Sequence, residues 1–502
     1  MKNRIGWLLI VQLIAGSCVA QNEVRLIISD TSGPLISKYI YGEFAEHLGR
    51  CIYDGFYRNG RIRMDIVEAM RKIKLPLLRW PGGCFADDYH WRDGVGPLDK
   101  RARNINATWG MVPEDNSFGT DEFLHLCSLI GCEPYIAGNV GSGTPEELEN
   151  WIEYCNFDGI SDNANLRAHN GHKSAYHVKF WGIGNESWGC GGRMTPETYA
   201  AKYRTFANYT RSYPGSPIMR IVSGAEDDDY NWTEYMMGHI SRRFMQGIGV
   251  HYYASAVGSG TSFSEAEYFK GLQSALRMEE IVSKHSAIMD KYDPEKKVWL
   301  IIDEWGIALN DDWRADQSLM YQQNSLRDAL IAATTLNIFN NHCDRIRMAN
   351  LAQTVNVLQA LVLTSGDSML LTPTYYVFDL YKVHQDAKWL PVPLTSSPYY
   401  VNKGDSIPAI NASASEDSNR VIHVSLVNLD PNRHITVSMK INGSRYSTVR
   451  GKVLTSDQYT NVNTFSAPGK IAIRAFSDYQ KENGTLRVNM PPKAVVLLEL
   501  TL

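Results

Sequence analysis

The segment Val298-Trp299-Leu300-Ile301-Ile302-Asp303-Glu304 shows the pattern that decides the fold. Its apolar residues are consecutive, so both faces of the strand that it predicts are buried, and carboxylates follow where the run ends. Between about Ile36 and His384 the chain repeats a short apolar run, a polar or glycine-rich stretch and a helix-like stretch. The apolar runs cover residues 39–42, 75–80, 134–137, 178–183, 218–222, 248–252, 298–302 and 345–349.

These runs make eight strand-then-helix units over about 350 residues, which predicts an α/β fold with a (β/α)8 TIM barrel and long loops. We expect this barrel to occupy residues 36–389. The active site of such a barrel lies at the carboxyl ends of the strands, where the loops after the strands meet. The polar residues that follow each apolar run are therefore the candidate site residues.

The pattern of the sequence changes after about Trp389. Apolar residues alternate with polar ones over 422–426 and over 435–440, and residues 430–433 between them are typical of a turn. This alternation predicts a half-buried antiparallel hairpin. We therefore expect a C-terminal antiparallel β-sandwich domain over residues 390–502.

The beginning of the chain divides into two parts. Residues 1–20 have the three-part form of a secretory signal, with a basic start, an apolar run over 5–15 and small residues up to a cleavage site after Ala20. The apolar run is too short to span a bilayer. Residues 21–35 contain a strand-like segment, 23–29, that we expect to join the sandwich. The sequence thus predicts export to the periplasm or the outside, without a membrane span.

The eight cysteines follow no regular spacing, and no pair has the spacing of a zinc site. Without Cys18 seven remain, so at least one is unpaired, and buried free thiols are expected rather than a disulfide scaffold. Cys18 raises a lipoprotein alternative, which is less favoured because Ala15-Gly16-Ser17 lacks a large apolar residue. Cys84 follows Gly82-Gly83, where the backbone can approach a ligand, and is predicted to be a free thiol in the site.

The composition excludes several classes of protein. Of the 502 residues 44% are hydrophobic and 21% charged, which is typical of a globular chain of two or three domains. The net charge of -4 gives no electrostatic footprint for nucleic acid.

The acidic run 226–229 could bind a cation, but acids also suit the dipole at a helix start, so a solvated loop is favoured.

Two carboxylates on different predicted strands, Glu186 and Glu304, are the sharpest feature of the candidate site. Glycoside hydrolysis needs such a pair, because one acid protonates the leaving oxygen while one carboxylate attacks or activates water. Asn185 stands beside Glu186, where an amide can hold a sugar hydroxyl. Glu304 follows a buried run, where a charge is costly unless it has a role or a partner.

Simpler interpretations stay open for other residues at the strand ends. Glu46 and His47 can form a structural pair, and Arg79 can simply balance a carboxylate. Cys84 can be a packed thiol rather than a contact of a ligand.

Five motifs stand in order and span essentially the whole chain after residue 20. They are Tyr41-Gly42-Glu43-Phe44-Ala45-Glu46-His47-Leu48-Gly49-Arg50, Arg79-Trp80-Pro81-Gly82-Gly83-Cys84-Phe85 with Trp91-Arg92-Asp93-Gly94-Val95-Gly96-Pro97, Gly184-Asn185-Glu186, Asp303-Glu304-Trp305 and Asn350-Leu351-Ala352-Gln353-Thr354-Val355-Asn356. Together they resemble glycoside hydrolase family 51, the α-L-arabinofuranosidases. The resemblance implies a (β/α)8 barrel with a β-sandwich, as the patterns predict, and a retaining, exo-acting glycosidase that needs no metal or cofactor.

The resemblance also implies roles for single residues. Glu186 matches the general acid/base, and Glu304 matches the nucleophile that forms a covalent glycosyl–enzyme. Arg79 would keep Glu304 ionised by its charge. The expected substrate-binding residues are Glu46, Arg79, Cys84, Trp109, Asn185, His251, Tyr253 and Gln353.

The resemblance implies that the partners are plant arabinan, arabinoxylan or their oligosaccharides, which the sequence does not rank. Members of the family are commonly homo-oligomers, often hexamers. The nearest alternative is a retaining β-xylosidase or endoglucanase on the same barrel. A non-catalytic sugar-binding protein is the alternative from another class. Such a protein would lack one of the two catalytic carboxylates, and this sequence has both Glu186 and Glu304.

Overall fold

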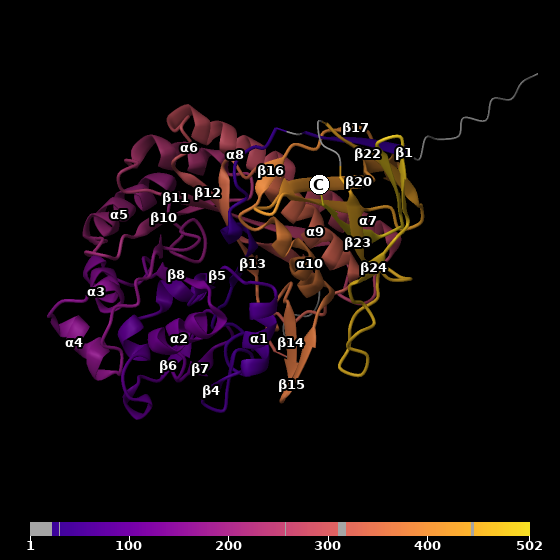
Figure 1. The fold of residues 1–502 in the computed structure, drawn as a ribbon. Coiled ribbons are helices and arrows are strands. Elements are labelled where there is room, and N and C mark those ends of the chain that lie inside the picture. The colour runs from indigo at the N-terminus through magenta and orange to yellow at the C-terminus, as the bar shows by residue number, and fades with distance from the viewer. Residues whose placement is uncertain (1–22, 30, 257, 310–317, 443–445, 502) are drawn as a thin grey trace, which may run out of the picture.

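The computed structural model describes residues 23–29, 31–256, 258–309, 318–442 and 446–501. Its centre is a closed barrel of eight parallel strands, which confirms the predicted TIM barrel (Figure 1). In their order around the barrel the strands are β2 (Gly42–Phe44), β5 (Leu77–Trp80), β8 (Glu133–Gly138), β9 (Phe180–Ile183), β10 (Met219–Glu226), β11 (Gly247–Ala256), β12 (Trp299–Leu309) and β13 (Ile346–Ala352).

Helices follow the strands and cover the outside of the barrel. The α-helices are α1 (Met64–Lys72), α2 (Thr120–Ile130), α3 (Pro145–Asn156), α4 (Asp162–His169), α5 (Pro196–Tyr209), α6 (Tyr230–His239), α7 (Glu265–Leu276), α8 (Met278–Tyr292), α9 (Leu326–Asn341) and α10 (Pro373–Tyr381). The short 3-10 segments are η1 (Lys38–Tyr41), η2 (Cys84–Asp88), η3 (Trp91–Gly94), η4 (Leu98–Lys100) and η5 (Lys382–His384). Small hairpins in the loops pair β3 (Tyr57–Arg58) with β4 (Arg61–Ile62), β6 (Asn104–Asn106) with β7 (Val112–Glu114), β14 (Val362–Ser365) with β15 (Ser368–Leu371), and β18 (Tyr399–Asn402) with β19 (Asp405–Pro408).

Several barrel strands differ from the predicted runs, β2 and β12 most of all. Residues 39–41 belong to the 3-10 segment η1, and β2 begins only at Gly42. A Cβ atom at Gly42 would lie 2.6 Å from Asn350 Oδ1, so the close approach of β2 to β13 requires glycine there. β12 continues past its predicted end because it pairs with β11 as far as Leu309. Glu304 therefore lies within a strand and not after one.

The C-terminal part forms two packed sheets, which confirms the predicted sandwich. The five-stranded sheet has the order β17 (Leu394–Ser396), β1 (Glu23–Ile28), β22 (Ile435–Ile441), β26 (Thr485–Met490) and β25 (Tyr479–Glu482). The six-stranded sheet has the order β16 (Lys388–Leu390), β20 (Ile410–Glu416), β21 (Val421–Asn428), β27 (Ala494–Thr501), β23 (Thr448–Leu454) and β24 (Arg474–Phe476). The N-terminal strand β1 runs parallel to β22. The domain bounds given above stay predictions.

The predicted hairpin over residues 422–440 is wrong. Its two strands exist, but β21 pairs with β20 and β27 in one sheet, whereas β22 pairs with β1 and β26 in the other. Alternation of apolar and polar residues shows that one face of a strand is buried, but it does not show which strand lies next to it. β21 is moreover buried on both faces apart from its first residue, because helices of the barrel cover the outer face of its sheet.

Helix α9 fills the space between the barrel and the sandwich, beside α10 (Figure 1). Nearly all of its residues are buried, as expected for a helix with neighbours on every side. Its polar residues have partners: Tyr41 donates to Asn340 at 2.8 Å, and Asn337 donates to Asn411 of β20 at 2.7 Å. These hydrogen bonds fix the sandwich against the barrel.

A buried histidine makes a second link between the two parts. His384 at the end of η5 has Ser415 Oγ 2.7 Å from Nδ1 and Ser425 Oγ 2.6 Å from Nε2. Burial, together with the nearby His423, holds the pKa of His384 well below its ordinary value. A neutral imidazole suits this place, since it donates to one hydroxyl and accepts from the other.

We expect His384 to make the fold sensitive to acid. Below about pH 6.5 the imidazole of His384 binds a proton in the unfolded chain but not in the folded one. The free energy of unfolding therefore falls as the pH falls. His384→Gln keeps a donor and an acceptor but does not titrate. It should reduce the loss of stability between pH 6.5 and 5 by up to about 2 kcal/mol. Urea unfolding at several pH values measures this.

The exposed His434 provides the control. His434→Gln should leave the acid dependence of the wild type unchanged. If His384→Gln lost stability with the same slope as the wild type, the buried imidazole would not be the sensitive group.

Candidate active site

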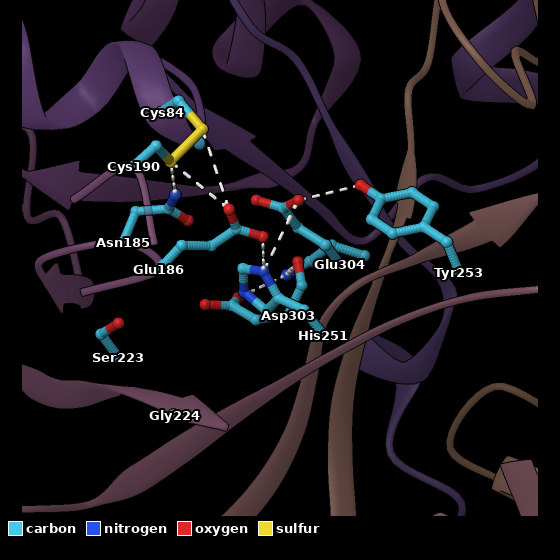
Figure 2. Close-up of polar contacts among 12 residues, drawn as sticks. Cys84, Asn185, Glu186, Cys190, Ser223, Gly224, His251, Tyr253, Asp303 and Glu304 are labelled. Atoms are coloured by element: carbon cyan, nitrogen blue, oxygen red, sulfur yellow. Dashed lines mark hydrogen bonds and ion pairs between the residues drawn. A yellow bond between two sulfur atoms is a disulfide. The ribbon is translucent and has the colours of Figure 1, made fainter. Parts of the chain in front are cut away.

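Glu304 lies on β12 at the mouth of the barrel, and two side chains, Arg79 and Tyr253, donate hydrogen bonds to its carboxylate; Figure 2 shows the bond from Tyr253. Arg79 Nη1 donates to Oε1 at 2.7 Å, and the hydroxyl of Tyr253 donates to Oε2 at 2.8 Å. Burial raises the pKa of Glu304, but the charges of His251 and Arg79 outweigh burial and hold it below its ordinary value. The carboxylate is therefore ionised near neutral pH, as a nucleophile must be.

Arg79 on β5 is buried beneath the mouth. Its Nη2 donates to Asn185 Oδ1 at 2.6 Å, its Nε lies 3.6 Å from Asp303 Oδ1, and its guanidinium lies 4.5 Å from the centre of the Phe44 ring. Burial lowers the pKa of Arg79, but the charges of Asp303 and Glu304 more than reverse this effect. A permanent positive charge thus stands next to Glu304.

Glu186 lies in the tight turn that follows β9, and its backbone has a φ of +37°, in the left-handed region. Its carbonyl accepts hydrogen bonds from Gly189 N at 2.7 Å and from Gly191 N at 3.0 Å. The next residue donates its N–H to Ser223 Oγ of β10 at 3.1 Å. The turn directs the half-buried side chain of Glu186 towards the same mouth as Glu304 (Figure 2).

His251 on β11 lies between the two carboxylates. Its Nδ1 is 3.0 Å from Glu186 Oε1 and 3.6 Å from Glu304 Oε2. Burial lowers the pKa of the imidazole, but the charge of Glu304 and the hydrogen bond to Glu186 raise it overall. An oxygen of Glu186 lies within 4.8 Å of an oxygen of Glu304.

The prediction that Cys84 is a free thiol is wrong, because Cys84 forms a disulfide with Cys190. Cys190 lies in the turn after β9, so the bond joins this turn to the loop after β5 (Figure 2). Sequence reasoning missed Cys190 because nothing in its local pattern distinguishes it from the other cysteines. The only local signal was its position four residues after Glu186. Cys84 still borders the site, through its contact with the carboxylate of Glu186.

Glu46 is the acceptor for several donors at the first strand. Its Oε1 accepts hydrogen bonds from the backbone N–H of Gly83 and Phe85 and from Trp109 Nε1, at 3.0, 3.1 and 2.8 Å. Its Oε2 accepts one from Gln353 Nε2 at 2.8 Å. Burial and the charge of Glu304 raise the pKa of Glu46 to about 7, although these hydrogen bonds oppose the rise.

The structural pair that was considered for Glu46 and His47 does not form. His47 Nδ1 lies 2.9 Å from Glu114 Oε2, and Trp80 Nε1 donates to His47 Nε2 at 3.1 Å. Since Nε2 accepts a hydrogen bond, the proton of the neutral ring is on Nδ1 and points to Glu114. His47 thus supports the loop, and Glu46 stays available to a ligand.

The candidate residues come together around a cavity of about 190 Å³. Seven of them line it, namely Glu46, Cys84, Trp109, Glu186, Tyr253, Glu304 and Gln353. The other three, Arg79, Asn185 and His251, lie behind the lining. Arg79 and His251 contact its carboxylates, and Asn185 accepts a hydrogen bond from Arg79. The sequence did not indicate the apolar part of the wall, which is formed by Leu48, Ala308, Met320 and Leu358.

Two groups among the described residues are close enough to hold a metal ion, Glu186 with His251 and Glu304, and Glu186 with the two bonded cysteines. In the first group the side chains already pair with one another, and in the second the sulfurs bond to each other. The acidic run 226–229 connects the end of β10 to α6, where Asp229 caps the helix and Arg277 pairs with Asp227 and Asp228. Independence from metals and cofactors stays a prediction.

Two family descriptions match the chain. The Alpha-L-arabinofuranosidase 1 domain matches residues 69–268, and the Alpha-L-arabinofuranosidase C-terminal domain matches residues 303–494. An intracellular exo-α-L-arabinofuranosidase of Bacteroides ovatus is 44% identical over 498 residues, with coverage of 96% of this chain and 97% of that protein.

The Bacteroides relative corrects the predicted export. That protein is named intracellular, which contradicts a periplasmic or secreted location for this chain. Residues 1–20, on which the predicted signal falls, lie outside the described residues. The prediction depended only on the composition of these residues, a basic start followed by a short apolar run. Among the helices that the structure describes, none has the length and apolarity to cross a membrane.

Solved structures agree with these relatives. The family 51 arabinofuranosidase of Xanthomonas axonopodis pv. citri superposes with a TM-score of 0.93 at 42% identity, over 95% of this chain and 100% of that one. An arabinose complex of the α-L-arabinofuranosidase of Thermotoga maritima gives 0.85 at 30% identity, over 95% and 100% of the two chains. With this sequence similarity, barrel and sandwich, the chain belongs to glycoside hydrolase family 51, the α-L-arabinofuranosidases.

Proposed function

We propose that the chain is a retaining, exo-acting α-L-arabinofuranosidase in which Glu304 attacks the anomeric carbon and Glu186 transfers the proton. The observation that carries this proposal is the unequal environment of two neighbouring carboxylates. Arg79 and Tyr253 both donate to Glu304, whereas neither contacts Glu186, which has His251 beside it. Such a difference in surroundings separates the roles of nucleophile and acid.

The separation of the two carboxylates supports retention. Retaining glycosidases hold their carboxyl groups about 5–5.5 Å apart, and inverting ones hold them about 6.5–9.5 Å apart to admit a water. Here one oxygen of Glu186 lies within 4.8 Å of one oxygen of Glu304, which matches the short separation of retaining enzymes rather than the longer one of inverting enzymes. The geometry suits direct attack by a carboxylate.

The reaction then has two steps. In the first, Glu304 attacks the anomeric carbon while Glu186 gives its proton to the leaving oxygen, and a covalent glycosyl–enzyme forms. In the second, the ionised Glu186 takes a proton from water, and this water displaces Glu304 with a second inversion. The charge of Arg79 opposes protonation of Glu304 in the free enzyme and when the carboxylate leaves.

The cavity supports exo action on one sugar ring. Its volume of about 190 Å³ suits a terminal monosaccharide rather than the interior of a polymer chain. Glu46 and Gln353, which line the cavity, offer acceptors and donors for ring hydroxyls, and Trp109 offers an apolar face. Asn185 offers its side-chain amide from behind the lining. These four residues are our proposed ring-binding set.

We propose that the enzyme acts inside the cell, as its Bacteroides relative does. The substrates would then be arabinose-bearing oligosaccharides derived from plant arabinan or arabinoxylan, since intact polymers do not enter cells. An oligomeric assembly stays a prediction.

A panel of aryl glycosides tests the function: we expect cleavage of the α-L-arabinofuranoside at least a hundredfold faster than of the β-xyloside or β-glucoside. Comparable rates on the xyloside would favour the β-xylosidase alternative.

The first prediction separates the two carboxylates. Glu304→Ala should abolish turnover on every substrate because no nucleophile remains. Glu186→Ala should keep the first step on an aryl arabinofuranoside whose leaving group is very acidic, since that group needs no proton. Its second step lacks a base, so the glycosyl–enzyme should accumulate after a burst. Rapid-mix kinetics and intact-protein mass spectrometry measure both effects.

Azide provides the control for these roles. As a small anion that needs no base, it should restore turnover of Glu186→Ala and give an arabinosyl azide with retained configuration. Rescue of Glu304→Ala with a retained product, and none for Glu186→Ala, would exchange the two roles. Full activity in both variants would exclude this pair as the catalytic one.

The second prediction concerns Arg79. Arg79→Gln removes a charge that lowers the pKa of Glu304, so a larger fraction of Glu304 is protonated at any given pH. Activity should therefore fade at a higher pH than in the wild type as the solution is acidified. We expect kcat/KM to fall about 10²–10³-fold at neutral pH. Arg420→Gln, at an exposed ion pair of the sandwich, should change neither quantity. If the activity of Arg79→Gln fell at the same acidic pH as that of the wild type, this result would contradict the role given to Arg79.

The third prediction concerns metals. The proposed chemistry uses carboxylates and one arginine, so dialysis against a strong chelator should leave kcat and KM within twofold of their starting values. A large loss that an added divalent cation restores would show that the group around Glu186, His251 and Glu304 holds a metal.

A further inference from the structure

The Cys84–Cys190 disulfide joins two loops at the mouth of the barrel (Figure 2). Cys84 begins η2 after β5, and Cys190 lies in the turn after β9, 106 residues later. The order of the barrel puts β8 between these two strands. The bond therefore spans the mouth past one intervening strand and borders the sugar cavity through Cys84.

The turn that it anchors is the one that carries Glu186. The left-handed backbone of Glu186 is a conformation that persists only where the surroundings fix it. Asp87 in η2 fixes one side, because its Oδ2 accepts a hydrogen bond from Asn185 N at 2.8 Å. The disulfide fixes the other side through Cys190, so η2 holds the turn both before and after Glu186.

Both sulfurs face one oxygen of Glu186. Cys190 Sγ lies 3.4 Å and Cys84 Sγ lies 3.8 Å from Oε2, while Oε1 is the oxygen beside His251 (Figure 2). Neither sulfur of a disulfide carries a proton, so neither donates to Oε2. No other hydrogen bond reaches Oε2 from the part of the chain that the structure describes. Oε2 is thus the oxygen that can carry the proton for the leaving group.

Reduction of the disulfide changes both the hydrogen bonding at Glu186 Oε2 and the anchoring of the Glu186 turn. Each sulfur becomes a weak S–H donor close to Oε2, and a hydrogen bond from it favours the ionised carboxylate over the acid that must give its proton. Two unbonded sulfurs also need more room than two bonded ones. The loops after β5 and β9 must therefore move apart at the point where the Glu186 turn is anchored.

We propose that the Cys84–Cys190 pair is a reducible positioning element for Glu186, and that its redox state sets activity on substrates with poor leaving groups. The inference rests on the proposed role of Glu186 as general acid. The co-reactant is a dithiol. One of its thiolates attacks a sulfur of the pair and breaks the S–S bond, and its second thiol then closes on the mixed disulfide. The dithiol is oxidised to a disulfide, and the enzyme gains two electrons and two protons as two thiols.

The pair is open to such a reductant. Cys190 is exposed and Cys84 is half-buried, whereas the free cysteines of the described residues are buried or, for Cys132, half-buried. Thiols are kept reduced inside most cells, and disulfides found there are usually transient or redox-sensing. An enzyme that acts inside the cell would therefore meet both states of the pair.

The test uses the full chain, first oxidised and then reduced with dithiothreitol. It is assayed on two aryl α-L-arabinofuranosides, one with an acidic dinitrophenyl leaving group and one with a weakly acidic methylphenyl group. Alkylation and mass spectrometry report the state of each cysteine. We expect reduction to lower kcat/KM about tenfold on the methylphenyl substrate and less than twofold on the other, because only the former needs the proton of Glu186. Reoxidation should restore the rate.

Two variants complete the design. Cys190→Ala cannot form the bond and should show the reduced pattern with or without reductant. Cys132→Ala, at the amino end of β8, should respond as the wild type does. Equal losses on both substrates, or no change in enzyme verified as reduced, would overturn the proposal. Failure of the proposed function would show separately, because Glu186→Ala would itself lack any dependence on the leaving group.

Discussion

The buried charge of Arg79 is the constraint on which the mouth of the barrel depends. A guanidinium removed from water needs partners nearby, and here Glu304 and Asn185 accept its hydrogen bonds while Asp303, next to Glu304 on β12, lies 3.6 Å from Nε. Each partner is held in turn: Asp303 accepts from Tyr135 at 2.9 Å and from Asn350 at 3.1 Å. The orientation of Glu304 follows from this network.

The loop after β5 packs closely against Glu46 on one side of the site and against Glu304 on the other. A Cβ atom at Gly82 would lie 2.6 Å from Glu46 Cγ, and one at Gly83 would lie 2.7 Å from Glu304 Oε1. Only glycines allow the backbone to pass between these carboxylates, and the N–H of Gly83 then reaches Glu46. The same loop continues into η2, where Asp87 and Cys84 hold the turn of Glu186. One loop thus organises Glu304, Glu46 and Glu186.

The sandwich contributes to the site indirectly. Its six-stranded sheet packs against α9 and α10, which follow the barrel strands β12 and β13. The amides of α9 and the imidazole of His384 have hydrogen-bond partners on the sheet, and Asn340 of α9 also accepts a hydrogen bond from Tyr41 on the barrel side. Since a buried polar group without a partner is costly, the barrel and the sandwich stabilise each other.

The sequence by itself determined the eight barrel units, Glu186 and Glu304, and the polar residues that line the cavity with them. Apolar runs and the polar residues after them are local, and a closed parallel barrel carries every such strand end to one mouth. Only the tertiary structure decided that β21 and β22 join different sheets and that Cys84 bonds to Cys190. Pairing between strands, and contact between residues 106 positions apart, depend on which segments become neighbours when the barrel closes. A local pattern records how buried a residue is, but not what lies beside it.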